Sequence, residues 1–228
     1  MKHGPKFFIG ALALLYIAFL LWFGGSGQAM SEREVESRLA RINELSGSDE
    51  ESVSRIGLDD IRAFAAGDDG REFFMVNLIE YRDKALYPEE LKLEMGDDPK
   101  SANNRYGRAV VPYLIRNGSF PIYTSNVRGR LIHPDGATDW DDVAIVRYRS
   151  RRDFLNMIEQ IMESTSPVMV HKWASVERTQ VFPTSAGPLL VSSNFVRMAV
   201  LALLAALAVT AICLTKLIRG LVLRRKEQ

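Results

Sequence analysis

The stretch DWDDVAIVRYRSRRDFLNMIEQIME, residues 139–163, predicts one strand that runs into one helix. In the strand half, residues 143–148 are mostly apolar on both alternating faces, which is typical of a strand covered on both sides. In the helix half, apolar residues recur at helical spacing: Phe154, Met157, Ile158, Ile161 and Met162. The period changes at Ser150, whose hydroxyl can accept a first-turn amide, and Asp153 completes a capping box with it.

The segments on either side of this unit predict the rest of an α+β domain. Alternating apolar patterns predict strands at residues 72–81, 120–127 and 174–182, and helical spacing predicts a helix at 101–117. Residues 82–99 are charged and contain Pro and Gly, so we expect a surface loop there, and Pro134-Asp135-Gly136 marks a hairpin turn. The resulting order is βαββαβ, which is the ferredoxin-like order.

A second copy of the domain is the expected partner of this sheet. Two helices cover only one face of a sheet, and the first and third strands are apolar on the other face as well. A homodimer that buries this second face is the simplest solution.

Two long apolar runs, residues 7–23 and 195–218, flank the domain. The second is long enough to supply the ~20 apolar residues of a membrane span. The first is either a signal peptide, because Gly27-Gln28-Ala29 resembles a cleavage site, or an uncleaved anchor. We favour the anchor, since the run is longer than the ~7 to 15 residues of a usual signal-peptide core.

The charge distribution predicts a topology. Basic residues follow the second run, and Lys2 and Lys6 precede the first: the downstream cluster is Lys216, Arg219, Arg224, Arg225 and Lys226. The positive-inside rule then places both termini in the cytoplasm of a bacterium, with the protein in the inner membrane and its domain in the periplasm. Residues 26–194 hold 21 Lys and Arg against 27 Asp and Glu, a net charge of −6, which argues against nucleic-acid binding.

The predicted division of the chain has six parts. They are an anchor at 1–25, a charged helical linker at 26–70, the ferredoxin-like domain at 71–183, a tether at 184–194, a transmembrane helix at 195–218 and a basic cytoplasmic tail at 219–228. Ala202, Ala206 and Thr210 recur every four residues in the second span, so a helix of a membrane protein partner could approach there; alanine is also simply abundant in this run.

Several polar and aromatic residues are candidates for a ligand site. Asn77 is a polar residue in an apolar strand and needs a partner, either a ligand carbonyl or neighbouring backbone. Tyr148 and Arg151 flank the strand-to-helix turn, where a guanidinium could hold a carboxylate or form a surface ion pair. Tyr106 and Trp140 could line a pocket or pack in the core.

His171 is the candidate general base, because the only other histidine of the domain region, His133, lies next to the predicted turn. The alternative is a structural or solvated histidine. The single cysteine, Cys213, lies in the second apolar run, so the domain can form no disulfide, cysteine nucleophile or Cys-ligated zinc site.

We expect neither a metal nor a cofactor. The acidic group Asp135, Asp139, Asp141 and Asp142 lacks the spacing of an EF-hand and is expected to be a solvated loop. The sequence contains no Gly-rich phosphate loop, nucleophile elbow or His-Glu zinc motif.

Three segments, MVNLIEYRDKALYP (75–88), RYGRAVVPYL (105–114) and WDDVAIVRYRSRRDFLNM (140–157), together resemble a bacterial family of dimeric α/β-barrel domains catalogued largely as a domain of unknown function. The resemblance implies two sheets paired face to face and a cleft between sheet and helices. In various relatives that cleft serves small organic molecules, cofactor-free oxidation or isomerisation, or haem. This chain departs from the family pattern by Arg149, where proline is usual in the strand-to-helix turn, and by its two apolar runs.

Two hypotheses of function follow. The first is a two-pass membrane protein whose dimeric α/β-barrel domain serves as a ligand-sensing or protein-interaction module of an envelope assembly. The second is a membrane-tethered, cofactor-free enzyme of the oxygenase or isomerase kind, with a cleft near His171.

Overall fold

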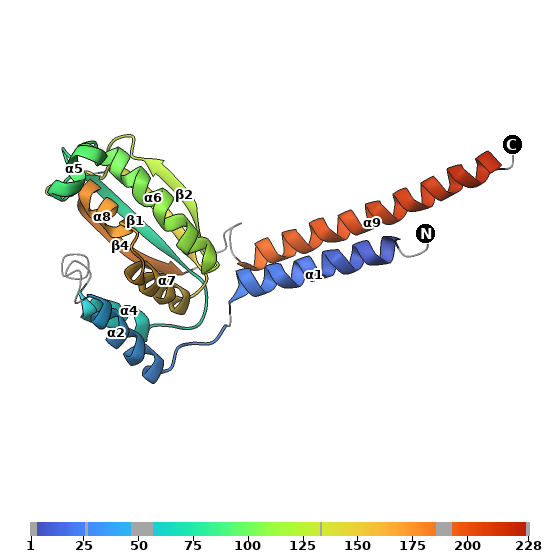
Figure 1. Cartoon of the computed structure of the whole chain (residues 1–228), viewed down its shortest axis with the longest axis horizontal. Coiled ribbons are helices and arrows are strands. Elements are labelled where there is room, and N and C mark those ends of the chain that lie inside the picture. Colours follow the sequence, from blue (N-terminus) through green and yellow to red (C-terminus); the bar gives the residue numbers. More distant parts are fainter. Residues whose placement is uncertain (1–3, 26, 47–56, 133, 186–192, 227–228) are drawn as a thin grey trace. The chain divides into compact units, whose positions relative to one another are not determined.

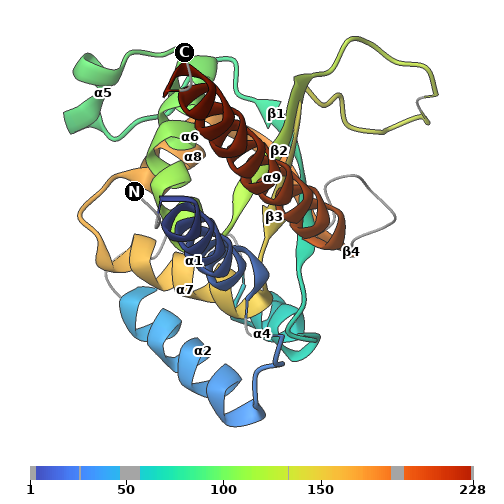
Figure 2. The same cartoon turned by 90° about the vertical axis from the view of Figure 1, so that its right-hand side faces the viewer.

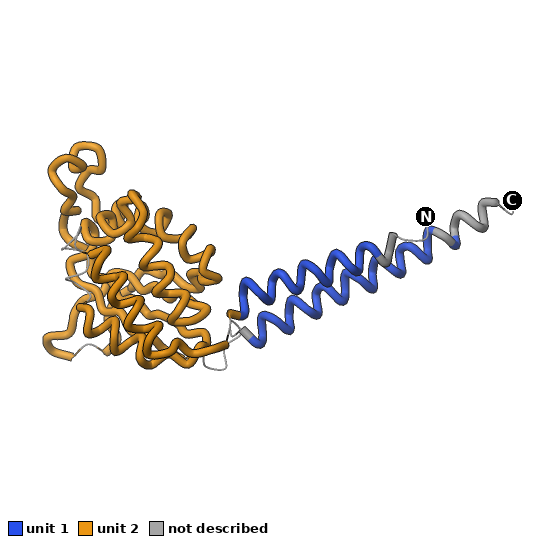
Figure 3. Tube along the Cα trace, turned by 60° about the horizontal axis from the view of Figure 1, so that its bottom comes forward, with its two compact units in different colours: residues 1–24, 187–228 blue, residues 25–186 orange. Residues whose placement is uncertain are grey.

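The computed structural model describes residues 4–25, 27–46, 57–132, 134–185 and 193–226. The chain divides into two compact units (Figure 3). We call Gly25–Ala186 the sheet domain and Met1–Gly24 with Gly187–Gln228 the helix pair.

The sheet domain contains a four-stranded antiparallel sheet (Figure 1). Its strands are β1 (Phe73–Tyr81), β2 (Phe120–Asn126), β3 (Asp142–Tyr148) and β4 (Val176–Ser185). They lie in the order β2-β3-β1-β4, and every neighbouring pair is antiparallel. The four predicted strands are therefore present, and the predicted α+β class is confirmed.

Three helices cover one face of this sheet (Figure 2). They are α6 (Pro99–Arg116), α7 (Arg151–Glu163) and α8 (Val168–Ser175). Ser150 caps α7 as predicted, because its Oγ accepts the amide of Asp153 at 3.1 Å. The core between sheet and helices contains Phe73, Met75, Val110, Leu114, Tyr148, Met157, Ile161 and Val168. We call this side the helical face of the sheet.

Two helices of the predicted helical linker, α2 (Glu32–Ser46) and α4 (Leu58–Ala66), pack on α7. Leu155 of α7 is fully buried between them, in a second cluster with Val35, Leu39, Ile42, Ile61 and Ala65. Residues 26–70, expected to be a linker, thus belong to the same compact unit as the sheet for the part that the structure describes.

Two short helices correct the sequence-based prediction. The expected surface loop at 82–99 contains α5 (Glu89–Met95), which begins after Pro88 with acidic residues in its first turn and ends at Gly96, whose φ of 71° suits glycine. The segment expected as the exit from α7 folds into α8, so the last strand begins at Val176 rather than Ala174. Both helices are shorter than three turns, so their periodicity is weak.

The second face of the sheet, which we call the open face, carries apolar side chains that are partly exposed. Residues directly opposite each other in a ladder share a face, so Val76 aligns with Ile145 and Phe182, and Leu78 aligns with Val143. Phe182 is 38% exposed. The helices α6, α7 and α8 lie on the opposite face of the sheet.

The helix pair consists of α1 (Gly4–Gly24) and α9 (Ser193–Lys226), which run antiparallel side by side (Figure 1). Nη2 of Arg197, near the start of α9, donates to the carbonyl of Gly24 at the end of α1 at 3.2 Å. Phe7–Gly24 and Asn194–Ile218 are long and apolar enough to cross a membrane. The predicted tether at 184–194 lies largely outside the described residues.

Candidate functional site

The structure separates most of the residues that the sequence suggested for one ligand site. Nδ2 of Asn77 donates to the carbonyls of Met75 (3.1 Å) and Ala144 (3.3 Å), so this amide bonds to neighbouring backbone. Nη1 of Arg151 donates to the carbonyl of Phe64 at 2.6 Å and so joins α7 to α4. The two side chains therefore serve different contacts in different parts of the domain.

Two further aromatic residues were predicted for the site, Tyr148 and Trp140. Tyr148 is 7% exposed, its ring stacks on Phe73 at 5.2 Å, and burial raises the pKa of its hydroxyl. Trp140 is half-buried in the connection between β2 and β3. Tyr148 thus acts as a core residue on the helical face.

Tyr106 of α6 lies near two other predicted residues: His171 on the packed helix α8, and Tyr148 in the core of the helical face. Small residues allow close packing of α6 and α8, since Ala102 and Ala174 are at most 1% exposed. Tyr106 and His171 belong to a cluster of six side chains. The members are Tyr87, Arg105, Tyr106, His171, Lys172 and Trp173. We call this cluster the α6–α8 site.

Tyr87 reaches the site because its segment is fixed by backbone hydrogen bonds. The amide of Leu86 donates to the carbonyl of Ala174 at 2.9 Å, and the amide of Arg82 donates to the carbonyl of Ser175 at 3.0 Å. Tyr87 is itself 7% exposed. The segment between β1 and α5 is thus attached to the end of α8.

His171 is buried at the centre of the site. Its Nδ1 lies 3.0 Å from the hydroxyl oxygen of Tyr87, and the side chain is 7% exposed. Burial, and second the positive charge of Arg105, lower the pKa of His171 below its usual value. The imidazole is therefore neutral at neutral pH, and a neutral Nδ1 is able to accept the Tyr87 hydroxyl.

Two cations of the site lack a carboxylate partner among the residues that the structure describes. The guanidinium of Arg105 makes no hydrogen bond or ion pair with them, and its Nη1 is shielded from solvent. Nζ of Lys172 lies 5.6 Å from the ring centroid of Tyr106 and 5.1 Å from that of Trp173. By contrast, the nearby Arg82 pairs with Glu177 at 2.5 Å.

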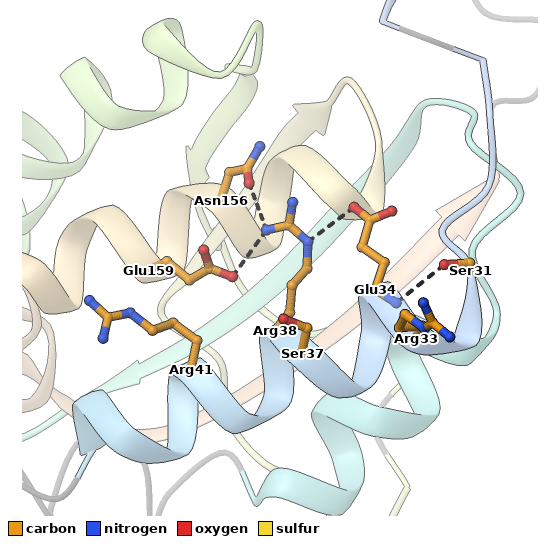
Figure 4. Close-up of a pocket in the computed structure, with 8 residues that line it drawn as sticks. All are labelled: Ser31, Arg33, Glu34, Ser37, Arg38, Arg41, Asn156 and Glu159. Atoms are coloured by element: carbon orange, nitrogen blue, oxygen red, sulfur yellow. Dashed lines mark hydrogen bonds and ion pairs between the residues drawn. The ribbon is translucent and has the colours of Figure 1, made fainter.

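A second charged region, the open groove between α2 and α7, has a volume of about 590 Å³ (Figure 4). Arg38 lies at its centre, where Nη1 donates to Oδ1 of Asn156 (2.6 Å) and Oε1 of Glu159 (3.0 Å), and Nε donates to Glu34 (3.3 Å). Arg152 donates to the same Glu34 and lowers the pKa of that carboxyl. These charges hold α2 on α7.

The acidic residues near the β2–β3 connection include two that join strand ends. Oδ2 of Asp142 accepts the Tyr81 hydroxyl at 2.5 Å, and Oδ2 of Asp141 accepts the amide of Tyr81 at 2.7 Å. Within the described residues, no group of three or more His, Cys, Asp and Glu side chains is placed to hold a metal ion.

The sequence reasoning missed Tyr87 and Arg105. Tyr87 falls in the segment that was expected to be a loop. Arg105 lies three residues after the buried Ala102 and four before Ala109, which packs against the core, so helical spacing places a charge near the inward side of α6. That spacing was a usable signal.

Comparisons with known proteins assign no activity to this chain. No family model matches it, and no curated protein matches it. Among solved structures, a protein of unknown function from Rhodopseudomonas palustris is 26% identical, with 57% of this chain and 94% of that chain covered and a TM-score of 0.47. A methylated form of that protein is also 26% identical, with 57% of this chain and 92% of that chain covered and a TM-score of 0.47.

Proposed function

We propose that this chain is a two-pass protein of a bacterial inner membrane that displays a ferredoxin-like domain in the periplasm, paired with a second copy into a dimeric α/β barrel. The domain then serves as a ligand-sensing or protein-interaction module of an envelope assembly. The observation that carries the proposal is the open face, where apolar side chains line all four strands without a covering helix of the sheet domain among the described residues.

The strand order supports the ferredoxin-like assignment. In β2-β3-β1-β4 the two central strands are β1 and β3, and each is followed along the chain by a helix that packs on the helical face. This is the arrangement of a split βαβ sheet. Sheets of this kind leave one face free for a partner.

The open face is also large enough for a stable interface. Strands of about nine residues at ~3.3 Å per residue, set ~4.8 Å apart, give about 500 Å² of flat sheet, and projecting side chains increase the accessible area. A standard interface buries about 800 Å² on each partner. A second copy therefore fits the apolar character of the face, and the area is of the same order as that of a standard interface.

The helix pair supports the membrane part of the proposal. The antiparallel arrangement of α1 and α9 puts the start of α1 and the end of α9 on the same side of the pair, which fits two crossings with both ends on one side of a membrane. The basic residues that follow the second span favour the cytoplasm for that side. Ala202, Ala206 and Thr210 are exposed on α9, and a membrane protein partner along them stays a prediction.

The enzyme hypothesis is the second candidate. One observation favours it, because burial keeps His171 neutral and a neutral imidazole can act as a general base. Its Nδ1 is already engaged by Tyr87, however, and Asn77 and Arg151 bond to backbone elsewhere. We therefore rank it below the module.

Cysteine cross-linking of the full chain in membranes tests the pairing. The Cys213→Ser background removes the only native thiol, and Val76→Cys then places one thiol on the open face. We expect a short bis-maleimide to join Val76→Cys chains into covalent dimers, and not to join chains carrying Arg108→Cys on the exposed side of α6. Ile145→Cys, opposite Val76 on β3, is a second variant of the open face. Equal cross-linking of Val76→Cys and Arg108→Cys would contradict the pairing, and so would the absence of cross-linking in both Val76→Cys and Ile145→Cys.

The topology has a separate test. Ser185, at the end of β4, is exposed. In the same background, Ser185→Cys should react with a membrane-impermeant maleimide applied to intact spheroplasts. Protection until lysis would place the domain in the cytoplasm instead.

A further inference from the structure

We infer that the α6–α8 site binds a small organic carboxylate with an apolar, preferably aromatic, body, held by Arg105 and Lys172. This inference names a ligand class for the sensing module and rests on the proposed function in that respect. It does not depend on the pairing of the sheets, because the site lies among helices on the other side of the sheet.

The first argument is the missing partner of Arg105. A shielded guanidinium nitrogen without an acceptor costs free energy, so an acceptor from outside the chain, a water molecule or a ligand, would stabilise it. Elsewhere the sheet domain satisfies its shielded arginines: Nε of Arg147 lies 2.8 Å from Glu72, and Nη2 of Arg149 lies 2.6 Å from Asp153. Arg105 differs from both, since Nη1 has no partner among the described residues.

The second argument is the sign of the charge. The side chains that interact with His171 and Lys172 in the site are Tyr87, Tyr106 and Arg105, none of which is an acid. Arg105 and Lys172 therefore give the site a net positive charge. The charge of Arg105 reaches His171 and lowers its pKa, which agrees with a guanidinium that no carboxylate neutralises. An anion is the ligand that this environment favours.

The third argument is the chemistry of the neighbouring side chains. A guanidinium matches a carboxylate with two parallel hydrogen bonds, and an ammonium adds a point charge. The rings of Tyr106 and Trp173, which lie beside Lys172, supply apolar surface. Two cations among rings suit one carboxylate on a flat apolar body better than a phosphate, whose three free oxygens need more donors.

Calorimetric titration of the full chain in nanodiscs with benzoate tests the inference, with empty nanodiscs as the blank. We expect saturable binding of benzoate and none of benzamide, its neutral counterpart. Because a hydrogen bond to a charged group is worth about tenfold to a hundredfold in affinity, Arg105→Gln should weaken benzoate binding by that factor. Arg108→Gln, on the exposed side of the same helix, is the matched control and should bind as the wild type does.

Two further measurements complete the test. Without ligand, Arg105→Gln should melt at or above the wild-type temperature, because a shielded, unpartnered charge is removed. Lys172→Gln should also weaken benzoate binding, which keeps the test valid should Arg105→Gln fold poorly.

Absence of saturable benzoate binding, equal binding by Arg105→Gln, or tighter binding of inorganic phosphate than of benzoate would overturn the inference. Subunit number, measured on the same samples, shows separately whether the pairing of sheets fails.

Discussion

The two faces of the sheet carry similar apolar side chains but differ in how they are covered. On the helical face, Phe73 and Met75 of β1 are 5% and 6% exposed. On the open face, Val76 and Leu78 of the same strand are only half-buried, and Phe182 of β4 is 38% exposed. One strand therefore serves two different environments. The difference teaches that the chain supplies its own cover for one face and leaves the other for a partner.

The largest expected effect separates the two faces by the same chemical change. Leu114→Ala, which empties a fully packed position on the helical face, should lower the free energy of unfolding by about 3 to 4 kcal/mol. Leu78→Ala on the open face should cost less than about 1 kcal/mol when the protein is dilute, because that side chain is already partly exposed to water.

Urea unfolding of the full chain in a mild detergent, followed by circular dichroism, measures both losses. The loss for Leu78→Ala should grow with protein concentration, since pairing would bury this residue. Equal, concentration-independent losses at Leu114 and Leu78 would show that the two faces do not differ.

The second prediction concerns the end of the open face where the side chains, Phe74 and Arg147, are buried. Arg147 aligns with Phe74 on this face, yet it is 1% exposed, with Nε 2.8 Å from Glu72 and Nη1 2.9 Å from the carbonyl of Gly118. Glu72→Ala leaves this buried guanidinium without its carboxylate and should cost about 3 kcal/mol. The same urea unfolding measures it, and a loss below that of Leu78→Ala would mean that this end of the face is open to water.

The strand-helix unit, β1 and the capping of α7 were predictable because their signals are local. A two-residue period sets the strands, and Ser150 with Asp153 sets the helix start. The short helices α5 and α8 were missed although Pro88 and Pro167, at their N-caps, are usable start signals.

The candidate site was less predictable, for a physical reason. Asn77 found backbone partners, which the sequence left open. Whether Arg105 has a carboxylate partner depends on which side chains the tertiary structure brings near it. The sequence alone does not predict that. Leu155, too, is buried because α7 packs on two sides, so its role appears only with α2 and α4 in place.

The smallest expected effect is the loss of folding stability at low pH that protonation of His171 causes. Because burial lowers the pKa of His171 in the folded state, the unfolded state binds its proton more readily, at about pH 6.5. The stabilisation is therefore complete above that pH and is lost as the pH falls through the folded-state pKa. The charged or titratable groups that face His171 among the described residues are Tyr87 and Arg105.

Melting temperatures of the wild type and His171→Asn between pH 7.5 and pH 5 measure this effect. The wild type should lose more stability on acidification than His171→Asn does, because the variant has no imidazole to protonate. Parallel pH profiles would mean that His171 is open to water.

Subunit number tests the central claim, that the open face is covered by a second copy. Native mass spectrometry of the full chain released from a mild detergent should show two copies for the wild type and for Arg108→Glu on the exposed side of α6. Ile145→Glu, which puts a charge at the middle of the open face, should give one copy with unchanged circular dichroism. A single copy for the wild type, or two copies for a folded Ile145→Glu, would contradict the account.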